Sequence, residues 1–216
     1  SLNREIWVDA HPLPKLDDLF AKTVGAEVFT KLDLAAAYHQ IELHPDSKHL
    51  TAFVSPVGAY QYCRMPFGLA PAAAVFQRVM SQLLRGIEGV VVFQDDVLIF
   101  AKDKDIHEKR LHQVLSIFAE QGVVLKKEKC LFFCKEVEYL GHKISGKGIR
   151  PRPGLMDAIV KSPPPKDKTG IKSFLGMCEF YSKFIPNYAT RVKPLSNLLR
   201  GGVKFAWNSE CESAFK

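Results

Sequence analysis

The chain has 216 residues, of which 47% are hydrophobic, so it can bury the core of one large or two small domains, and it shows neither an apolar run of membrane-spanning length nor a signal-peptide pattern. Its five cysteines include no CxxC pair, which favours a reducing compartment over a disulfide framework. The formal net charge of +7 is concentrated in residues 147–216, where thirteen Lys and Arg stand against five Asp and Glu, and this predicts a polyanionic partner unless the lysines only keep the surface soluble.

Strands and helices are predicted to alternate in the first 122 residues. Four runs rich in β-branched and aromatic residues predict strands, over 27–34, 49–56, 90–93 and 97–100. Two runs with apolar residues at helical spacing predict helices, over 71–87 and 103–122. The second helix ends at Gly122, as helices often do.

Proline and glycine are dense between residues 145 and 170, in "SGKGIRPRPG" and "KSPPPKDKTG". That density predicts an end to regular structure and hence a boundary. Beyond it, helices are predicted over 169–185 and 191–201. The sequence therefore predicts an α+β body followed by a basic helical third.

The turn between the strands at 90–93 and 97–100 carries two adjacent aspartates, Asp95 and Asp96. Asp is a common turn residue, so a plain turn is the simplest interpretation. The favoured two-residue hairpin turns contain glycine, however, and this turn has none. Asp33 ends an earlier predicted strand, and three clustered carboxylates cannot all stay ionised cheaply without cations. Divalent ions that also bind substrate phosphates would compensate them, so nucleic-acid chemistry is the hypothesis.

Six blocks of the sequence, in order, resemble the reverse transcriptases of long-terminal-repeat retrotransposons, most closely the Ty3/gypsy group and more distantly the retroviral enzymes. The blocks are HPLPKLDDLF, FTKLDLAAAYHQI, YCRMPFGLAPAAAVFQRVM, FQDDVLIFAK, KKEKCLFFCKEVEYLGHKIS and IKSFLGMCEFYSKFIPNY. They cover nearly the whole chain at the family's spacing. The resemblance implies an RNA-directed and DNA-directed DNA polymerase that copies retrotransposon RNA, by attack of a primer 3′-hydroxyl on the α-phosphate of a dNTP.

The resemblance also implies a right-hand polymerase, an α+β fold with a ferredoxin-like antiparallel-sheet palm, partial fingers and a helical thumb. Residues 1–146 are expected to form the palm with partial fingers. Residues 147–216 are expected to form the basic thumb and the start of a connection toward an absent RNase H domain. Because the match begins just after the family's basic fingers strand, we expect a fragment of a Pol polyprotein that binds primer-template weakly and extends primers poorly or not at all on its own.

By position, Asp33, Asp95 and Asp96 match the family's catalytic carboxylates, which implies a metal site for two Mg²⁺ ions, with Mn²⁺ as an alternative. Asp33 and Asp95 are expected to bind both ions, while Asp96 mainly shapes the field and the hairpin. The carboxylates of Asp33 and Asp95 are expected within roughly 3–5 Å of each other, since two ligands of one Mg²⁺ cannot be far apart. Lys129 matches a lysine that donates a proton to pyrophosphate.

Further matches imply contacts with substrate and nucleic acid. The positions expected around the incoming dNTP are Leu34, Tyr38, Phe67 and Gly68, where the Tyr38 ring would exclude a ribose 2′-hydroxyl. The positions expected to bind nucleic acid are Phe93, Tyr139, Leu140, Gly141, Lys172, Gly176 and Phe180. In the family the "YLG" segment grips the primer end, and the last three residues form a thumb face along the duplex minor groove. A role in the core alone is the alternative for Tyr38 and Phe180.

Two positions depart from the family pattern. Phe93 stands where the family usually has Tyr, so a hydroxyl near the primer is lost. Pro71 occupies the position of a Ser or Asn that can cap the following helix, a loss on the order of 1 kcal/mol. These departures leave a second hypothesis open, a catalytically weak, decayed or domesticated nucleic-acid-binding remnant. The family implies an intracellular protein, cytoplasmic in a virus-like particle or nuclear, with primer-template and dNTPs as partners and no membrane.

Overall fold

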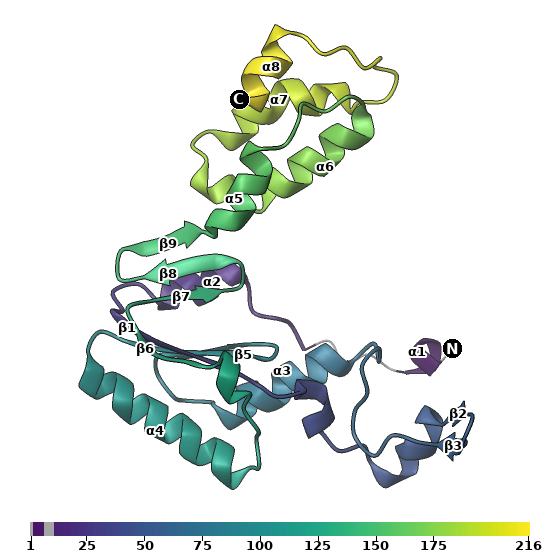
Figure 1. Cartoon of the computed structure of the whole chain (residues 1–216), viewed down its shortest axis with the longest axis vertical. Helices are drawn as coiled ribbons and strands as arrows, with labels where there is room; N and C mark the ends of the chain where they lie inside the picture. Colours follow the sequence, from purple (N-terminus) through teal and green to yellow (C-terminus); the bar gives the residue numbers. More distant parts are fainter. Residues whose placement is uncertain (1, 7–10) are drawn as a thin grey trace. The chain divides into compact units, whose positions relative to one another are not determined.

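The computed structural model describes residues 2–6 and 11–216, and the chain divides into two compact units. The sheet unit comprises residues 1–140 and 144–149, and the helical unit comprises residues 141–143 and 150–216. Figure 1 shows the elements of each unit. None of the helices in the described part of the chain is long and apolar enough to cross a membrane.

The described residues form the following helices and strands. The helices up to residue 129 are α1 (Leu2–Glu5), α2 (Leu16–Lys22), η1 (Ala37–Gln40), η2 (Pro45–Thr51), α3 (Ala72–Leu83), α4 (Lys104–Glu120) and η3 (Lys127–Lys129), where η denotes a 3₁₀ helix. The strands are β1 (Val28–Asp33), β2 (Phe53–Ser55), β3 (Gly58–Tyr60), β4 (Val90–Phe93), β5 (Asp96–Ala101), β6 (Leu131–Cys134), β7 (Glu136–Tyr139), β8 (His142–Ser145) and β9 (Gly148–Pro151). The remaining helices are α5 (Pro153–Val160), α6 (Lys168–Glu179), η4 (Ser182–Phe184), α7 (Tyr188–Leu198) and α8 (Ser209–Phe215).

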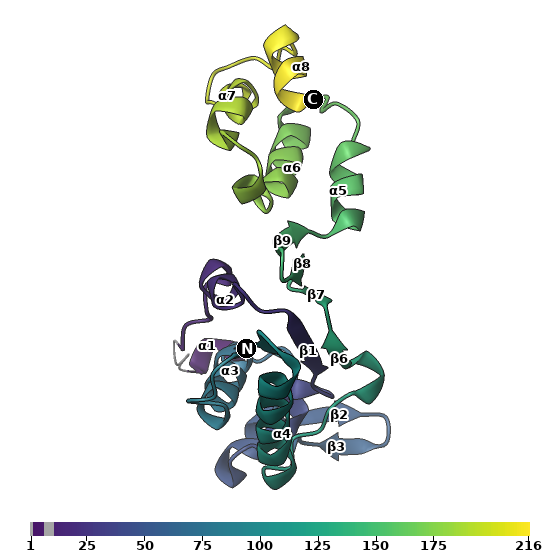
Figure 2. The ribbon, with the colours of Figure 1, turned by 90° about the vertical axis from the view of Figure 1, so that its left-hand side faces the viewer.

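A four-stranded antiparallel sheet in the order β4-β5-β1-β6 forms the framework of the sheet unit. Side chains alternate between its two faces, because successive residues of a strand point to opposite sides. Leu32 and Val97 lie on the face that packs against α3 and α4, and Phe29 and Leu98 lie on the face that packs against α2 and β7. Figures 1 and 2 show α2 and α4 on opposite sides of this sheet. Because both faces are covered, the register of the strands is fixed.

The predicted α+β fold with antiparallel sheets is confirmed in its main elements. The helices predicted over 71–87 and 103–122 are α3 and α4, and the strands predicted over 27–34, 90–93 and 97–100 are β1, β4 and β5. These elements have strong periodic patterns and many partners in one core, so local preference and packing agree. The two remaining strands of the first half, β2 and β3, form a separate antiparallel pair.

Two local predictions are wrong. The strand predicted over 49–56 is only β2, because residues 45–51 form η2, where side chains of His44 and Thr51 hydrogen-bond to nearby backbone groups. Such local bonds compete with strand pairing. The proline-rich stretch 145–170 does not end regular structure, since it contains β9 and α5. Pro153 lies in the first turn of α5, where a missing backbone N–H costs nothing.

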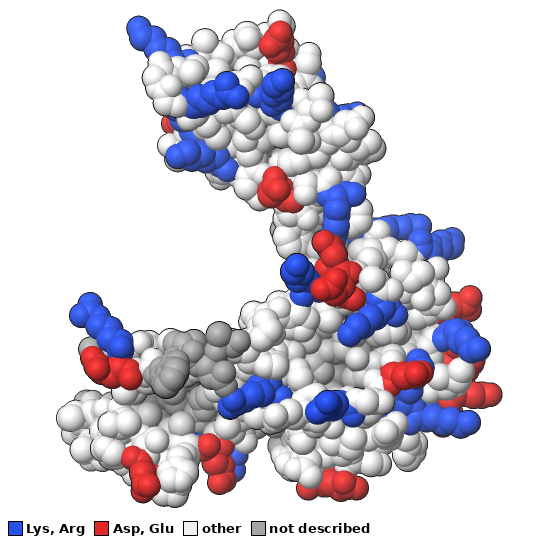
Figure 3. Space-filling model, turned by 180° about the vertical axis from the view of Figure 1, so that it is seen from behind, with Lys and Arg blue, Asp and Glu red and all other residues white. Residues whose placement is uncertain are grey.

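The helical unit has a core of its own, in which Ile171, Leu195 and Cys211 join α6, α7 and α8. The carboxylate of Asp167 caps α6 by accepting a hydrogen bond from the Gly170 N–H at 2.7 Å. The helix predicted over 169–185 ends as α6 at residue 179, and η4 follows it. On the face of this unit seen in Figure 3, Lys and Arg side chains are dispersed with isolated acidic ones among them.

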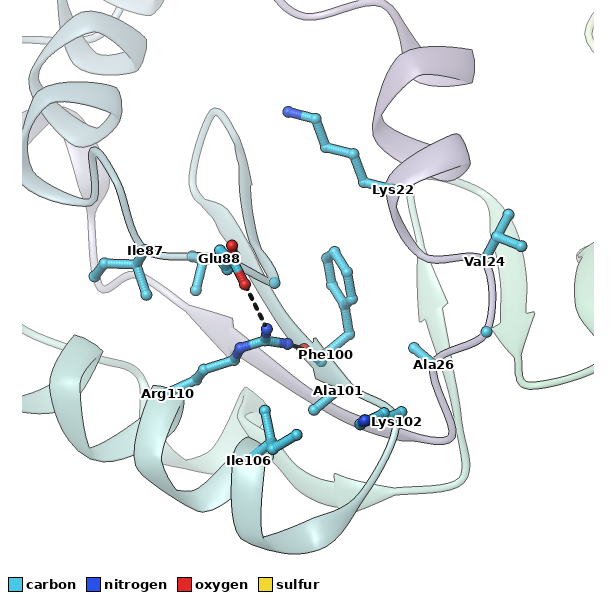
Figure 4. A pocket seen from close by; sticks show the side chains of 13 residues that line it. Lys22, Val24, Ala26, Ile87, Glu88, Phe100, Ala101, Lys102, Ile106 and Arg110 are labelled. Carbon is cyan, nitrogen blue, oxygen red and sulfur yellow. Dashed lines mark hydrogen bonds and ion pairs between the residues drawn. The ribbon is translucent and has the colours of Figure 1, made fainter.

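A pocket of about 600 Å³ opens beside the end of β5 that lies away from the β4–β5 turn. Figure 4 shows Lys22, Phe100, Lys102 and Arg110 in its wall, with the Arg110 guanidinium paired to Glu88. None of the residues predicted to act on substrate, metal or nucleic acid lines this pocket. The pocket is therefore not the candidate site, although its wall contains a glycine at which an added side chain would collide with its neighbours.

That position is Gly89, where the backbone has φ +68° and no room for a side chain. A Cβ atom there would run into the carbonyl oxygen of Phe100 and the guanidinium of Arg110, which donates a hydrogen bond to the same carbonyl at 2.8 Å. We expect Gly89→Ala to lower the free energy of unfolding by about 2–4 kcal/mol, because the backbone strain and the collision add. Urea denaturation followed by circular dichroism measures the loss.

Gly25→Ala is the matched control, since Gly25 lines the same pocket at φ +78° but has nothing within 4 Å of an added Cβ. Its expected loss is about 1–2 kcal/mol, the cost of a left-handed alanine alone. Equal losses for the two variants would show that the collision at Gly89 contributes nothing.

Candidate active site

The hairpin of β4 and β5 turns through two residues, Gln94 and Asp95, and is closed by Phe93 opposite Asp96. The tight turn predicted from the sequence is thus confirmed. Gln94 has φ +53°, a left-handed conformation that a residue other than glycine adopts only at a cost. Contacts from outside the turn must offset that cost.

Gln77 of α3 supplies these contacts. Its Oε1 accepts a hydrogen bond from the Gln94 N–H at 2.8 Å, and its Nε2 donates to the carbonyl oxygen of Val92 at 3.0 Å. The Gln77 side chain is only 1% exposed, so both bonds are shielded from water. Gln77 was not predicted as a site residue, but a signal exists, because it is a polar residue beside Phe76 and Met80 on the buried face of the helix.

Asp33 ends β1 directly opposite Asp96 of β5. The next residue, Leu34, is hydrogen-bonded to the turn: its N–H donates to the carbonyl oxygen of Asp95 at 3.2 Å. The N–H of Lys126 donates to the carbonyl oxygen of Asp33 at 2.8 Å, which ties the segment after α4 to the same point. The three aspartates therefore lie at one end of adjacent strands, as the sequence predicts.

The short helix η3 brings Lys129 and Cys130 to Asp33. Lys129 Nζ lies 3.8 Å from Asp33 Oδ2, and the lysine side chain is 57% exposed while that of the aspartate is 17% exposed. The Cys130 thiol lies under the backbone of Asp33, whose N–H donates to Sγ at 3.5 Å. Lys129 is thus close to the carboxylates, as a proton donor there must be, and its role stays a prediction.

Asp96 is ion-paired to a lysine that was not predicted as a site residue. Lys31 Nζ lies 2.9 Å from Asp96 Oδ1, and both side chains are about one-fifth exposed. Burial raises the pKa of Asp96, the Lys31 ammonium opposes that rise, and Asp95 and Asp33 add to it. The strand period could have indicated Lys31, because it stands two residues before Asp33 and so shares a face with it.

Carboxylate oxygens are the ligands that hard divalent cations prefer, so the residues present fit such an ion chemically. Within residues 2–6 and 11–216, however, no group of three or more His, Cys, Asp and Glu side chains is arranged to hold one. This absence agrees with the ion pair between Lys31 and Asp96, which occupies one oxygen of the Asp96 carboxylate. Asp33 and the exposed Asp95 remain as the ligands that fit, and their approach within roughly 3–5 Å stays a prediction.

Tyr38 lies in η1, just after the acidic end of β1. Its ring packs against Phe67 and Phe76, with centroid distances of 5.2 and 5.8 Å. Burial raises the pKa of the Tyr38 hydroxyl and the Asp95 carboxylate raises it further, which places the hydroxyl in the field of the aspartates. Leu34 differs from expectation, because its side chain is 3% exposed and belongs to the core, so only its backbone can face a substrate.

The loop that carries Phe67 and Gly68 is held by Asn3 of α1. Asn3 Nδ2 donates to the carbonyl oxygen of Gly68 at 2.8 Å, and its Oδ1 accepts from the Ala70 N–H at 2.9 Å. Pro71, where α3 begins, has no side-chain cap, as expected. A distant amide therefore binds the loop where a local polar residue is missing, and no local pattern could have identified it.

Tyr139 and Phe93 pack beneath the hairpin on the face that carries Phe29 and Leu98. Tyr139 is 1% exposed, and its hydroxyl lies 3.5 Å from the carbonyl oxygen of Asp96. The alternation of β7 thus turns the Tyr139 side chain into the core, so only its backbone can face nucleic acid, and that contact stays a prediction. Leu140 follows at φ +49° in the turn before β8 and stays a predicted contact.

In the helical unit, Lys172, Gly176 and Phe180 are exposed, away from the buried residues of α6. The Phe180 ring packs against His142, with a centroid distance of 5.0 Å. A Cβ at Gly141 would meet the Phe180 ring at 3.2 Å, so the glycine makes room for the aromatic side chain. The predicted common face exists, and its contact with nucleic acid stays a prediction.

Comparison with known proteins gives consistent results. The chain matches the family model described as reverse transcriptase (RNA-dependent DNA polymerase) over residues 2–144. It is 38% identical over 205 residues to the retrovirus-related Pol polyprotein from transposon 297 of Drosophila melanogaster, a match over 94% of the chain and 19% of that polyprotein. It is 34% identical over 208 residues to the transposon Tf2-3 polyprotein of Schizosaccharomyces pombe, a match over 95% of the chain and 16% of that polyprotein. The chain thus spans less than a fifth of the length of either relative.

Two solved structures share the fold. The foamy viral protease-reverse transcriptase dRH in complex with double-stranded DNA aligns with a TM-score of 0.90 at 24% identity, over 99% of this chain and 38% of that chain. The foamy viral protease-reverse transcriptase in complex with an RNA/DNA hybrid aligns with a TM-score of 0.84 at 24% identity, over 99% of this chain and 30% of that chain. These likenesses extend to both compact units.

Proposed function

Since the chain belongs to the reverse transcriptase (RNA-dependent DNA polymerase) family, we propose that it is the palm, part of the fingers and the thumb of an RNA-directed and DNA-directed DNA polymerase from a Ty3/gypsy-type retrotransposon Pol polyprotein. The observation that supports the proposal is the pairing of Asp33 with Asp96 across β1 and β5, with Asp95 in the adjoining turn between β4 and β5. Backbone bonds from Leu34 and Lys126 fix this end of the sheet independently of any ligand.

In the proposed reaction, the primer 3′-hydroxyl attacks the α-phosphate of a dNTP and pyrophosphate leaves. Asp33 and Asp95 would hold two divalent ions, Mg²⁺ or alternatively Mn²⁺, which would supply charge stabilisation for the attacking and leaving oxygens. Asp96 keeps the hairpin in place through its backbone pairing with Asp33. Lys129, exposed and 3.8 Å from Asp33, donates a proton to the leaving pyrophosphate.

The substrate is proposed to lie against Tyr38, the 65%-exposed ring of Phe67 and the backbone of Gly68. The Tyr38 ring cannot move away freely, because Phe67 and Phe76 pack against it. A fixed ring at that place leaves no room for a ribose 2′-hydroxyl and so selects dNTPs. Asn3 contributes indirectly, since it holds the Gly68 loop.

Primer-template is the proposed macromolecular partner. The two foamy viral structures are complexes with double-stranded DNA and with an RNA/DNA hybrid, which supports the same class of partner here. The helical unit supplies the exposed face of Lys172, Gly176 and Phe180 and its dispersed Lys and Arg side chains. Contacts of this kind go mainly to phosphates, so binding is expected to weaken as salt rises.

A nucleic-acid-binding remnant is the second candidate, and the substitutions at Phe93 and Pro71 favour it. A DNA primer annealed to an RNA template, incubated with the chain, dNTPs and Mg²⁺, distinguishes the two. We expect primers to lengthen, slowly for this chain alone, and chelation of Mg²⁺ by EDTA to stop the reaction. Binding of primer-template without any metal-dependent lengthening would favour the remnant. The absence of both binding and lengthening would contradict both candidates.

A further inference from the structure

Lys31 lies inside the acidic end of the sheet. Residues two apart on a strand share a face, so Lys31 and Asp33 point to the same side of β1. Asp33 is paired across the sheet with Asp96, and Lys31 is paired with Leu98, two residues further along β5. Lys31 is therefore the diagonal neighbour of Asp96, at a separation that a long side chain spans. Its Nζ reaches Asp96 Oδ1 at 2.9 Å.

This ion pair differs from the surface pairs of the molecule. The side chains of Lys31 and Asp96 are 20% and 21% exposed, whereas those of Lys161 and Asp157 in α5 are 78% and 67% exposed at 3.6 Å. Exposed pairs contribute little, because water and salt screen them, and a half-buried pair at short distance is screened less. Lys31 and Asp96 therefore hold each other in one arrangement.

The pair has a consequence for the carboxylate cluster. One oxygen of Asp96 is engaged by the ammonium, and the described residues contain no group of three or more His, Cys, Asp and Glu side chains that could hold a metal ion. We propose that Lys31 is a positioning residue that keeps Asp96 out of the metal-binding set and sets the affinity of Asp33 and Asp95 for divalent ions, an inference that rests on the proposed polymerase function. Lys31 acts through Asp96 and does not contact substrate.

Removal of the Lys31 charge is expected to have two opposite effects. The acidic end gains one uncompensated negative charge, so divalent ions bind about tenfold more tightly, allowing for partial screening. Asp96 also becomes free to turn toward the ions, which would displace them from the reacting oxygens. A small displacement at the reacting centre is expected to reduce turnover by about 10- to 100-fold. A lysine that only balanced charge would tighten metal binding when it is replaced but would not lower turnover.

The test begins with Mn²⁺ binding to the full chain without nucleic acid, followed by the electron paramagnetic resonance signal of free Mn²⁺. Lys31→Met is expected to lower the Kd about tenfold, and Lys31→Arg is expected to keep the wild-type Kd. The double variant Lys31→Met/Asp96→Asn removes the freed carboxylate as well, so its Kd is expected to return to that of the wild type. Lys109→Met, an exposed lysine of α4 on the other face of the sheet, is the control for a change of net charge alone.

Two further variants keep the test decisive even where Lys31→Met fails to fold. Asp96→Asn alone leaves the Lys31 ammonium uncompensated near the ions, so it is expected to weaken Mn²⁺ binding about tenfold through charge alone. Asp95→Asn removes a ligand as well as a charge and is expected to weaken binding at least about 100-fold. Equal losses in the two variants, or an unchanged Kd in a folded Lys31→Met, would overturn the inference.

Steady-state kinetics separate the inference from the proposed function. Lys31→Met is expected to lower kcat for dNTP incorporation with little change in KM, and Lys31→Arg is expected to restore it. If the chain binds Mn²⁺ as described but never extends a primer, the proposed function fails and the role of Lys31 stands. If Asp95→Asn does not weaken Mn²⁺ binding, the metal site itself is contradicted, and the inference falls with it.

Discussion

Asp95→Asn is expected to abolish primer extension, lowering kcat by about 10³-fold or more while the fold stays intact. Asp95 is exposed at the tip of the hairpin, and the turn is held by its backbone and by Gln77, so an amide of the same size leaves the structure in place. The change removes a carboxylate from the proposed metal ligands, and fixed charges at a phosphoryl-transfer site commonly supply about 10²–10³-fold each. Catalytic residues that act as a unit have non-additive effects, so replacing one of them can lower kcat by more than its own contact would.

Binding and activity are expected to separate in this variant. Primer-template affinity, measured by fluorescence anisotropy, should stay within about twofold, because phosphate contacts by the helical unit are unchanged. Asp18→Asn, an exposed aspartate in the first turn of α2, is the matched control and should retain full extension. Extension by Asp95→Asn at more than a tenth of the wild-type rate would contradict the assignment of the hairpin as the catalytic centre.

Tyr38→Ala is expected to reduce the discrimination between dNTPs and rNTPs by about 10²-fold in kcat/KM. The discrimination is proposed to be steric, and exclusion of a group of a few atoms from a close-fitting pocket is worth about 10–200-fold. The ring is fixed by Phe67 and Phe76, so its removal opens space that neighbouring side chains do not fill at once. Single-nucleotide incorporation of dCTP and rCTP opposite guanine measures the ratio.

Tyr38→Phe is the control for the ring, since it removes the hydroxyl near Asp95 and keeps the aromatic surface. Its discrimination is expected to equal that of the wild type. If Tyr38→Ala keeps the wild-type ratio while its urea midpoint falls, Tyr38 is a packing residue and the selection of sugars lies elsewhere.

The elements that could be predicted from the sequence are those with their own periodic pattern. The helices α3 and α4 and the hairpin of β4 and β5 show apolar residues at a clear spacing, and each lies in the central core. The stretch around α5 could not be predicted, because its prolines lie before, at the start of and after the helix rather than within it, and composition alone does not separate these cases.

The residues that hold the site were harder to predict than the carboxylates themselves. Asp33, Asp95 and Asp96 stand in recognisable blocks, whereas Gln77 and Asn3 act on turns that are 17 and 65 residues away along the chain. Such contacts depend on how the elements pack: the sequence marks Gln77 only as a polar residue on the buried face of a helix, and it carries no sign of Asn3.

Two expectations could have been improved from the strand pattern alone. Leu34 continues the alternation that buries Leu32, and Tyr139 continues the alternation that buries Val137, so both side chains turn toward the core. Resemblance to a family assigned them to binding, but the local period already indicated their burial.

The position of β4 at the edge of the sheet has a consequence for self-association. Val90–Phe93 is an uncharged run of strand-forming residues at a sheet edge, the kind of segment that pairs with a second copy and starts aggregation. The Gln77 amide occupies the carbonyl of Val92, and the run is followed by the exposed Asp95, whose negative charge repels the same residue of another copy. The carboxylate at the tip of the hairpin thus also acts as a gatekeeper of solubility, so its replacement by an amide makes the protein more prone to form intermolecular sheets when concentrated.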